Sequence, residues 1–107
     1  MSGSVLALNT VVENEIAALP ADMRAKLVRL SNLIEQHGFE GLPRDTVKHL
    51  DEKLWELRIT GRDAISRAIY VTASGKRMVI IRVFIKKTQK TPKSELETAR
   101  LRAKEVR

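Results

Sequence analysis

Three extended segments follow one another in residues 53–86, which read KLWELRITGRDAISRAIYVTASGKRMVIIRVFIK. Side chains alternate between apolar and polar over residues 53–60, as in a strand with one buried face. Residues 65–72 and 78–86 are rich in β-branched side chains, which also favour strands. Short turn-forming segments that contain glycine separate the three. The stretch therefore predicts an antiparallel meander of three strands.

The segments before this meander predict one strand and two helices. Residues 5–8 are apolar and follow a turn-prone Gly-Ser pair, so they predict a strand. Thr10 and Glu13 have the spacing of a capping box, which predicts a helix that begins at Thr10 and is ended by Pro20. Pro20 also suits the first turn of a second helix, which Gly38 is expected to end in a left-handed conformation. The two helices form a hairpin, whose apolar side carries Met23, Leu27, Leu30 and Ile34.

The remaining segments complete a small α+β domain. Residues 39–48 contain glycine, proline and aspartate and predict a loop, whereas Thr91 and Pro92 predict the start of a final helix. The order of elements over residues 1–107 is then β-α-α-β-β-β-α, in a single domain. We expect the helical hairpin to pack on one face of a four-stranded, mainly antiparallel sheet. With the helices on one face, the other would be left for a ligand.

The composition excludes several kinds of site. The 107 residues include no cysteine and two histidines. A disulfide framework, a zinc ribbon and a thiolate nucleophile are therefore excluded, and two histidines do not favour a metal site. No apolar run reaches the roughly 18 residues of a membrane span, and the first residues do not resemble a signal peptide. We expect a cytoplasmic protein that uses no metal or cofactor and does not bind membranes.

The positive charge is concentrated in the second half of the chain. The formal net charge is +7, from 20 lysine and arginine residues against 13 aspartate and glutamate residues. Residues 1–50 carry five basic and six acidic groups, so the excess lies in residues 51–107. Between residues 76 and 93 seven basic residues occur without an acidic one: Lys76, Arg77, Arg82, Lys86, Lys87, Lys90 and Lys93. Such a block favours a polyanionic partner, and the alternative is a solvated face that aids solubility.

Strand alternation predicts where some of these cations lie. The alternation over residues 78–86 directs four apolar side chains toward the helices, namely Val79, Ile81, Val83 and Ile85. Arg82 and Lys86 then point to the opposite face. In the first strand of the meander, Arg58 and Trp55 are three positions apart and therefore point to opposite faces. We expect Trp55 to pack in the core rather than to stack on a base. Arg58, Arg82 and Lys86 are therefore expected to line one polar surface.

The sequence lacks the familiar catalytic constellations. It contains no glycine-rich phosphate loop, no pair of histidines at metal-ligand spacing and no nucleophile elbow. Asp51 and Glu56 are isolated carboxylates, which we interpret as partners of neighbouring cations rather than as a catalytic pair. His49 is interpreted as structural or exposed, with a contact to substrate as the alternative.

Several stretches together resemble one known family. They are LWELRI at residues 54–59, Arg67 and Tyr70 in the next strand, FIKKTQKTP at residues 84–92, and Ala99 in the helix that follows. These residues, with a proline between two helices and a glycine after the second, resemble the phage-derived, HigB-like branch of the RelE/ParE toxin superfamily. The resemblance covers nearly the whole chain, and it implies a RelE-like fold.

The resemblance implies a toxin of a type II toxin–antitoxin pair. Such toxins cut mRNA on the ribosome and are silenced by an antitoxin with a helix-turn-helix domain. The implied reaction is attack of a ribose 2′-hydroxyl on its own phosphate, without a metal. Arginine stabilises phosphate charge but is a poor base, whereas a lysine among other cations can have a lowered pKa and transfer protons.

Residue roles follow from the match to the family motif. Arg58 and Arg67 are assigned to the transition-state phosphate, and proton transfer and backbone clamping to Lys86, Lys87 and Lys90. Further RNA contacts are assigned to Lys48, Tyr70, Arg82, Phe84 and Lys93. Tyr70 and Phe84 have a position in the core as the alternative. The chain departs from some relatives because it has no tyrosine or histidine near its C-terminus.

Two other functions are compatible with the same residues. One is a non-enzymatic toxin of the same fold that inhibits gyrase through surface contacts. The other is an RNA-binding relative without catalysis. Fold alone does not separate these classes, but a row of lysines at the end of a strand favours the nuclease.

Overall fold

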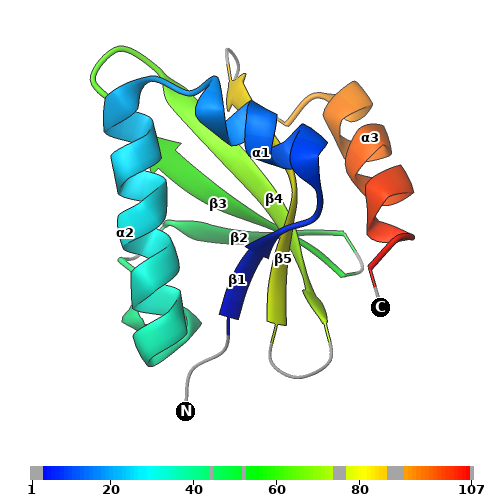
Figure 1. Ribbon diagram of the computed structural model, residues 1–107, viewed down its shortest axis with the longest axis horizontal. Helices are drawn as coiled ribbons and strands as arrows, with labels where there is room; N and C mark the ends of the chain where they lie inside the picture. The colour runs from blue at the N-terminus through cyan, green and yellow to red at the C-terminus, as the bar shows by residue number, and fades with distance from the viewer. Residues whose placement is uncertain (1–3, 44, 52, 74–76, 87–90, 107) are drawn as a thin grey trace.

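The computed structural model describes residues 4–43, 45–51, 53–73, 77–86 and 91–106 (Figure 1). In this part of the chain, five strands form one sheet: β1 (Ser4–Ala7), β2 (Val47–Asp51), β3 (Leu54–Thr60), β4 (Ile65–Ala73) and β5 (Arg77–Lys86). The helices are α1 (Thr10–Ala17), α2 (Ala21–His37) and α3 (Lys93–Ala103), with a short 3-10 helix over Phe39–Gly41. None of the described helices is both long and apolar enough to cross a membrane.

The sheet is mixed, in the order β1-β5-β4-β3-β2. β1 pairs with β5 in parallel, whereas every other neighbouring pair is antiparallel. The predicted meander of three strands is therefore confirmed as β3, β4 and β5. The predicted strand count is wrong, because β2 begins at Val47, within the segment 39–48 that was expected to be a loop, and continues to Asp51. Its residues pair with β3, for example His49 with Trp55.

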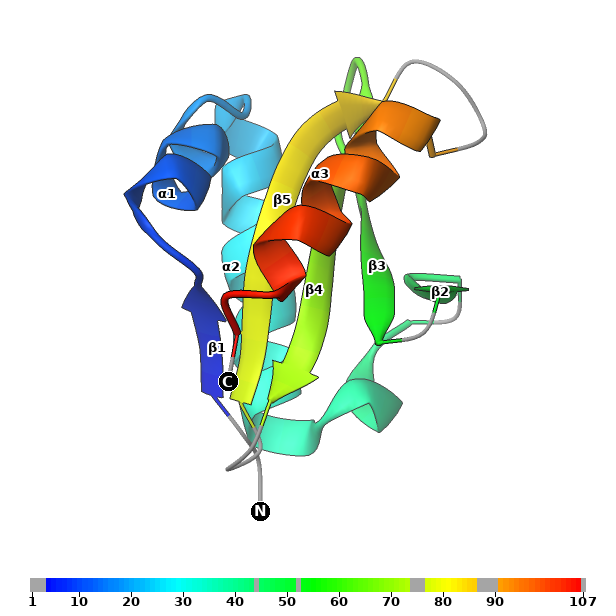
Figure 2. The same ribbon diagram turned by 90° about the vertical axis from the view of Figure 1, so that its right-hand side faces the viewer.

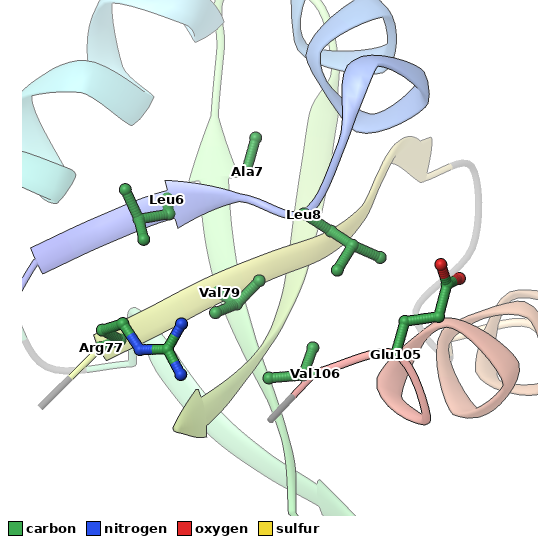
Figure 3. A pocket seen from close by; sticks show the side chains of 7 residues that line it. All are labelled: Leu6, Ala7, Leu8, Arg77, Val79, Glu105 and Val106. Carbon is green, nitrogen blue, oxygen red and sulfur yellow. The ribbon is translucent and has the colours of Figure 1, made fainter. Parts of the chain in front are cut away.

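The helices lie on both faces of the sheet, as Figures 1 and 2 show. The hairpin of α1 and α2 covers one face, as predicted. The larger core cluster lies there and joins Val12, Met23 and Leu27 to strand residues such as Leu57. On the other face, Ala99 of α3 packs in a second cluster. The expectation that the helices leave this second face open is therefore wrong, because α3 also has an apolar side to bury.

Local signals define the helix ends well. α1 begins at Thr10, but its N-cap is Asn9, whose side-chain oxygen accepts a hydrogen bond from the Val12 amide at 3.2 Å. The capping box predicted at Thr10 is therefore wrong by one residue, since Asn9 has the extended backbone that an N-cap needs. α2 begins directly after Pro20 and is ended by Gly38 at φ 72°, as predicted.

A β-bulge in β5 changes which side chains face the hairpin. Ile69 of β4 pairs with Arg82, but its neighbour Tyr70 pairs with Ile80, so Ile81 is an extra residue. Ile81 therefore packs on the α3 side, whereas Val83 packs on the hairpin side. The prediction that alternating apolar residues of this strand share the hairpin face is wrong, because a bulge inverts the alternation.

Candidate functional site

Strand pairing brings three predicted cations to one face of the sheet. Arg58 of β3 lies directly opposite Arg67 of β4, which in turn lies opposite Phe84 of β5. Lys86 is two residues beyond Phe84 and so points to the same face. This is the face on which α3 packs. By this register the three cations lie toward the end of the sheet where β5 finishes. Figure 2 shows α3 on this face of the sheet.

A pocket of about 330 Å³ opens beside the two arginines. Its lining comes from β2 and the residues before it, from β3 and from β4: Asp45, Thr46, Val47, Lys48, Arg58 and Arg67. Asp45 has φ 68° and lies within a turn closed by a 3.3 Å hydrogen bond from the Thr46 amide to the Pro43 carbonyl. The strand that the sequence did not predict thus forms one wall of the pocket.

The cations of this site are held in a largely buried environment. Arg67 is 7% exposed and Lys86 is 8% exposed. The Nε atoms of Arg58 and Arg67 are buried and make no hydrogen bond to the described residues. Because burying a donor without a partner is costly, the protein holds these two guanidinium groups at an energetic cost.

Glu56 is the carboxylate beneath the cations. Its side chain is 1% exposed, and its Oε1 lies 2.9 Å from Nη1 of Arg67 in an ion pair. Its Oε2 accepts a hydrogen bond from the hydroxyl of Thr91, the second residue before α3. The interpretation of Glu56 as the partner of a neighbouring cation is therefore confirmed.

Burial and repulsion between the cations lower the pKa values of Lys86 and Arg67. Burial lowers the pKa of the Lys86 ammonium, and the charges of Arg67, Lys48 and Arg58 lower it further, while Glu56 acts in the opposite direction. Burial also lowers the pKa of the Arg67 guanidinium, against the attraction of Glu56. Such shifts are typical of functional sites, where a lysine must exchange protons near neutral pH.

Arg82 points to the same face of the sheet as Phe84 and Lys86, as the alternation predicted, but its guanidinium is paired with acidic residues of two helices and does not line the pocket. Its guanidinium contacts Glu15 of α1 at 2.7 Å and Glu95 of α3 at 2.5 Å. Arg102 of α3 also contacts Glu15, at 2.8 Å. Arg82 is therefore held in an ion-pair network that joins α1, β5 and α3.

Tyr70 and Phe84 occupy the core positions that were the alternatives to RNA contacts. Tyr70 is fully buried on the hairpin side of the sheet, away from Arg67, and burial raises the pKa of its hydroxyl. Phe84 packs in the cluster under α3, on the same face as Arg67. Trp55 is half-buried against the hairpin core, as expected, with its ring centroid 4.7 Å from that of His49.

The remaining predicted site residues have different positions. Lys48 is exposed on β2 and lines the pocket, whereas Lys93 is exposed at the start of α3. Lys87 and Lys90 lie outside the described residues. Within the described ranges, no group of three or more histidine, cysteine, aspartate or glutamate residues could hold a metal ion.

Sequence reasoning missed three residues of the site. Asp45 and Thr46 belong to a turn, and Thr91 was assigned only to a helix start. The sequence carries no clear signal for the first two, because residues 47–51, which form the strand directly after them, do not alternate between apolar and polar side chains. The contact of Thr91 with Glu56 joins positions 35 residues apart, and no local pattern indicates it.

Comparison with known proteins identifies a family for nearly the whole chain. The family model described as phage derived protein Gp49-like (DUF891) matches residues 14–104, which include both α3 and the cationic site. No curated protein matches the chain. The chain therefore belongs to the Gp49-like phage-derived family, which is part of the RelE/HigB-like toxin superfamily.

Proposed function

We propose that this protein is the toxin of a type II toxin–antitoxin pair and that it cleaves mRNA bound to the ribosome. The family is associated with RelE-type toxins, which are endoribonucleases. The observation that carries the proposal is the pairing of Arg58 with Arg67 at an open pocket, with the buried Lys86 on the same face of the sheet. Two guanidinium groups and an ammonium group on one face suit a phosphodiester.

The proposed reaction is an internal transfer of a phosphoryl group. The ribose 2′-oxygen bonds to the adjacent phosphorus and loses its proton, while the bond from phosphorus to the 5′-oxygen breaks. The products are a 2′,3′-cyclic phosphate and a 5′-hydroxyl. A base must take the first proton, cations must stabilise the additional negative charge, and an acid must protonate the leaving oxygen.

The described residues can meet two of these needs. Arg58 and Arg67 remain charged at working pH and stabilise the phosphorane. Lys86, whose pKa is lowered by burial and by Arg67, has a larger neutral fraction than an exposed lysine and serves in proton transfer. Lys48 on the pocket wall contacts the RNA backbone. Lys87 and Lys90, assigned by the family motif, complete the set of cations in the proposal.

The proposed partners are mRNA on the ribosome and an antitoxin with a helix-turn-helix domain. The antitoxin is inferred from the family relationship, and the protein would act in the cytoplasm. A net charge of +7 suits binding to both RNA and an acidic partner segment.

The test is cleavage by purified protein added to ribosomes translating a defined mRNA, with cuts mapped by primer extension. We expect discrete cuts that are lost in Arg67→Ala and Lys86→Ala. The matched control is Arg29→Ala, which removes one exposed cation from α2 on the far side of the sheet. Supercoiling inhibition without cuts would identify a gyrase inhibitor instead. Salt-sensitive RNA binding without product would identify a non-catalytic relative.

A further inference from the structure

The carboxylate of Glu56 has an unusual place in a cationic site. At 1% exposure it is among the most buried charged groups of the described chain. A buried carboxylate is costly unless it is paired and hydrogen-bonded. Glu56 meets this requirement in part: Oε2 is hydrogen-bonded, whereas the buried Oε1 has the Arg67 ion pair but no hydrogen bond to the described residues. Its burial therefore depends on the positions of Arg67 and Thr91.

Each carboxylate oxygen of Glu56 engages a different side of the site. Oε1 pairs with the Arg67 guanidinium at 2.9 Å, and Oε2 accepts the hydrogen bond of the Thr91 hydroxyl. Arg67 belongs to β4, whereas Thr91 lies between β5 and α3. Glu56 on β3 thus connects the phosphate-binding strand to the end of the FIKKTQKTP stretch, which begins at Phe84.

The geometry excludes a direct chemical role for Glu56. With both oxygens engaged and almost no exposed surface, its carboxylate has no access to a 2′-hydroxyl of RNA in the pocket. Its negative charge raises the pKa of Lys86, whereas three surrounding cations lower that pKa: Arg67 from β4, Arg58 from β3 and Lys48 from β2.

We propose that Glu56 is the positioning residue of the cationic site, which fixes the Arg67 guanidinium and the Thr91 hydroxyl through its two carboxylate oxygens. This inference rests on the proposed function as far as RNA cleavage is concerned. It assigns to Glu56 the orientation of Arg67, the anchoring of the segment before α3, and the control of proton binding by Lys86. A misplacement of about 1 Å in such groups can reduce the rate about 100-fold.

The experiment separates charge from hydrogen bonding with four variants. Glu56→Gln keeps an oxygen that can accept from Thr91 but loses the ion pair with Arg67. Thr91→Val removes the hydroxyl and keeps the charge of Glu56, and Thr91→Ser retains the hydroxyl. Glu95→Gln is the matched control. Like Glu56→Gln, it removes a carboxylate that is paired with an arginine, but its partner is Arg82 of β5 and it lies outside the site.

Two readouts are measured on each folded variant. The first is the single-turnover rate of mRNA cleavage on ribosomes as a function of pH. The second is the titration of the Lys86 side chain by NMR, assigned by comparison with Lys86→Met, which does not depend on cleavage. Circular dichroism and urea unfolding confirm that each variant is folded under assay conditions.

We expect Glu56→Gln to reduce cleavage about 100-fold and to lower the pKa of Lys86, because an opposing negative charge is lost. The pH dependence that Lys86 imposes on the rate should move to lower pH by the same amount. Thr91→Val should reduce cleavage without moving the Lys86 titration, while Thr91→Ser and Glu95→Gln should match the wild type in both readouts.

Other outcomes overturn the inference. A folded Glu56→Gln variant with the wild-type rate, or with an unshifted Lys86 titration, shows that Glu56 does not position the site. If Glu56→Gln does not fold, Thr91→Val decides, and a wild-type rate in that variant contradicts the proposal. If the wild type itself cleaves no RNA, the proposed function fails, while the Lys86 titration in Glu56→Gln still tests the linkage.

Discussion

Arg58 and Arg67 lie directly opposite each other on β3 and β4, so two guanidinium groups face the same side of the sheet. Like charges at directly opposed positions destabilise a sheet, and the burial of Arg67 adds to the cost. The ion pair of Arg67 with Glu56 offsets part of it. An arrangement that opposes folding is expected where it serves the binding of a ligand of opposite charge.

Arg58→Gln should stabilise the protein and impair its function. Loss of the repulsion with Arg67 is expected to raise the free energy of unfolding by about 0.5 kcal/mol. Cleavage should fall, because one phosphate-binding group is removed. Urea unfolding and the ribosomal cleavage assay measure the two effects, with Arg29→Gln on α2 as the control for loss of one positive charge. A destabilised Arg58→Gln variant would contradict the interpretation that this pair is strained.

Lys86 should make stability depend on alkaline pH. Its pKa is lowered in the folded protein, so between that pKa and the ordinary value of about 10.4 the unfolded chain binds more protons. The contribution of Lys86 to the free energy of unfolding therefore rises with pH between these two pKa values. At a pH below both of them, the charged Lys86 ammonium opposes folding. Lys86→Met removes this contribution and should be the more stable protein at pH 7, while the proposed function predicts that it loses RNA cleavage.

The measurement is urea unfolding of the wild type and of Lys86→Met at intervals from pH 7 to pH 10. Other titrating groups, including Tyr70, are common to both proteins, so the difference between the two curves reports Lys86 alone. If the difference in the free energy of unfolding between the two proteins stays constant over this range, burial does not lower the pKa of Lys86.

Arg82→Met should weaken the fold and leave the chemistry intact. The substitution removes the 2.5 Å ion pair of Glu95 with Arg82, and it leaves Glu15 with the ion pair to Arg102 and the hydrogen bond from the Val83 amide. Because these side chains are partly exposed, a loss of about 1 kcal/mol is expected, and it should shrink as salt is added. Thermal unfolding at low and high salt tests this. Loss of cleavage in a folded Arg82→Met variant would instead support the original assignment of Arg82 to RNA binding.

Asp45→Asn should strengthen RNA binding. The carboxylate of Asp45 lines the cationic pocket, where it repels phosphate. Asparagine tolerates the left-handed backbone at φ 68°, so the turn should be retained. We expect the affinity for a single-stranded RNA oligonucleotide to rise about threefold at low salt, which is within the range of one exposed charge pair. Fluorescence anisotropy measures it, and weaker binding would indicate that Asp45 contacts the RNA.

Local sequence determined most of the elements and the placement of the main cations. The alternation of residues 54–60 put Arg58 on the face opposite to Trp55, and Pro20 and Gly38 set the limits of the second helix. These features depend on backbone preferences and on side-chain period, which act over a few residues and can be recognised in the sequence alone.

Only the tertiary structure decided which cations share a site. The contacts of Arg82 with Glu15 and Glu95 join β5 to two helices, and no local pattern indicates them. Thr91 reaches Glu56 across 35 residues of chain, and β2 forms only because β3 offers it an edge. Such contacts depend on the free energy of packing distant segments together, which alternation and turn residues do not encode.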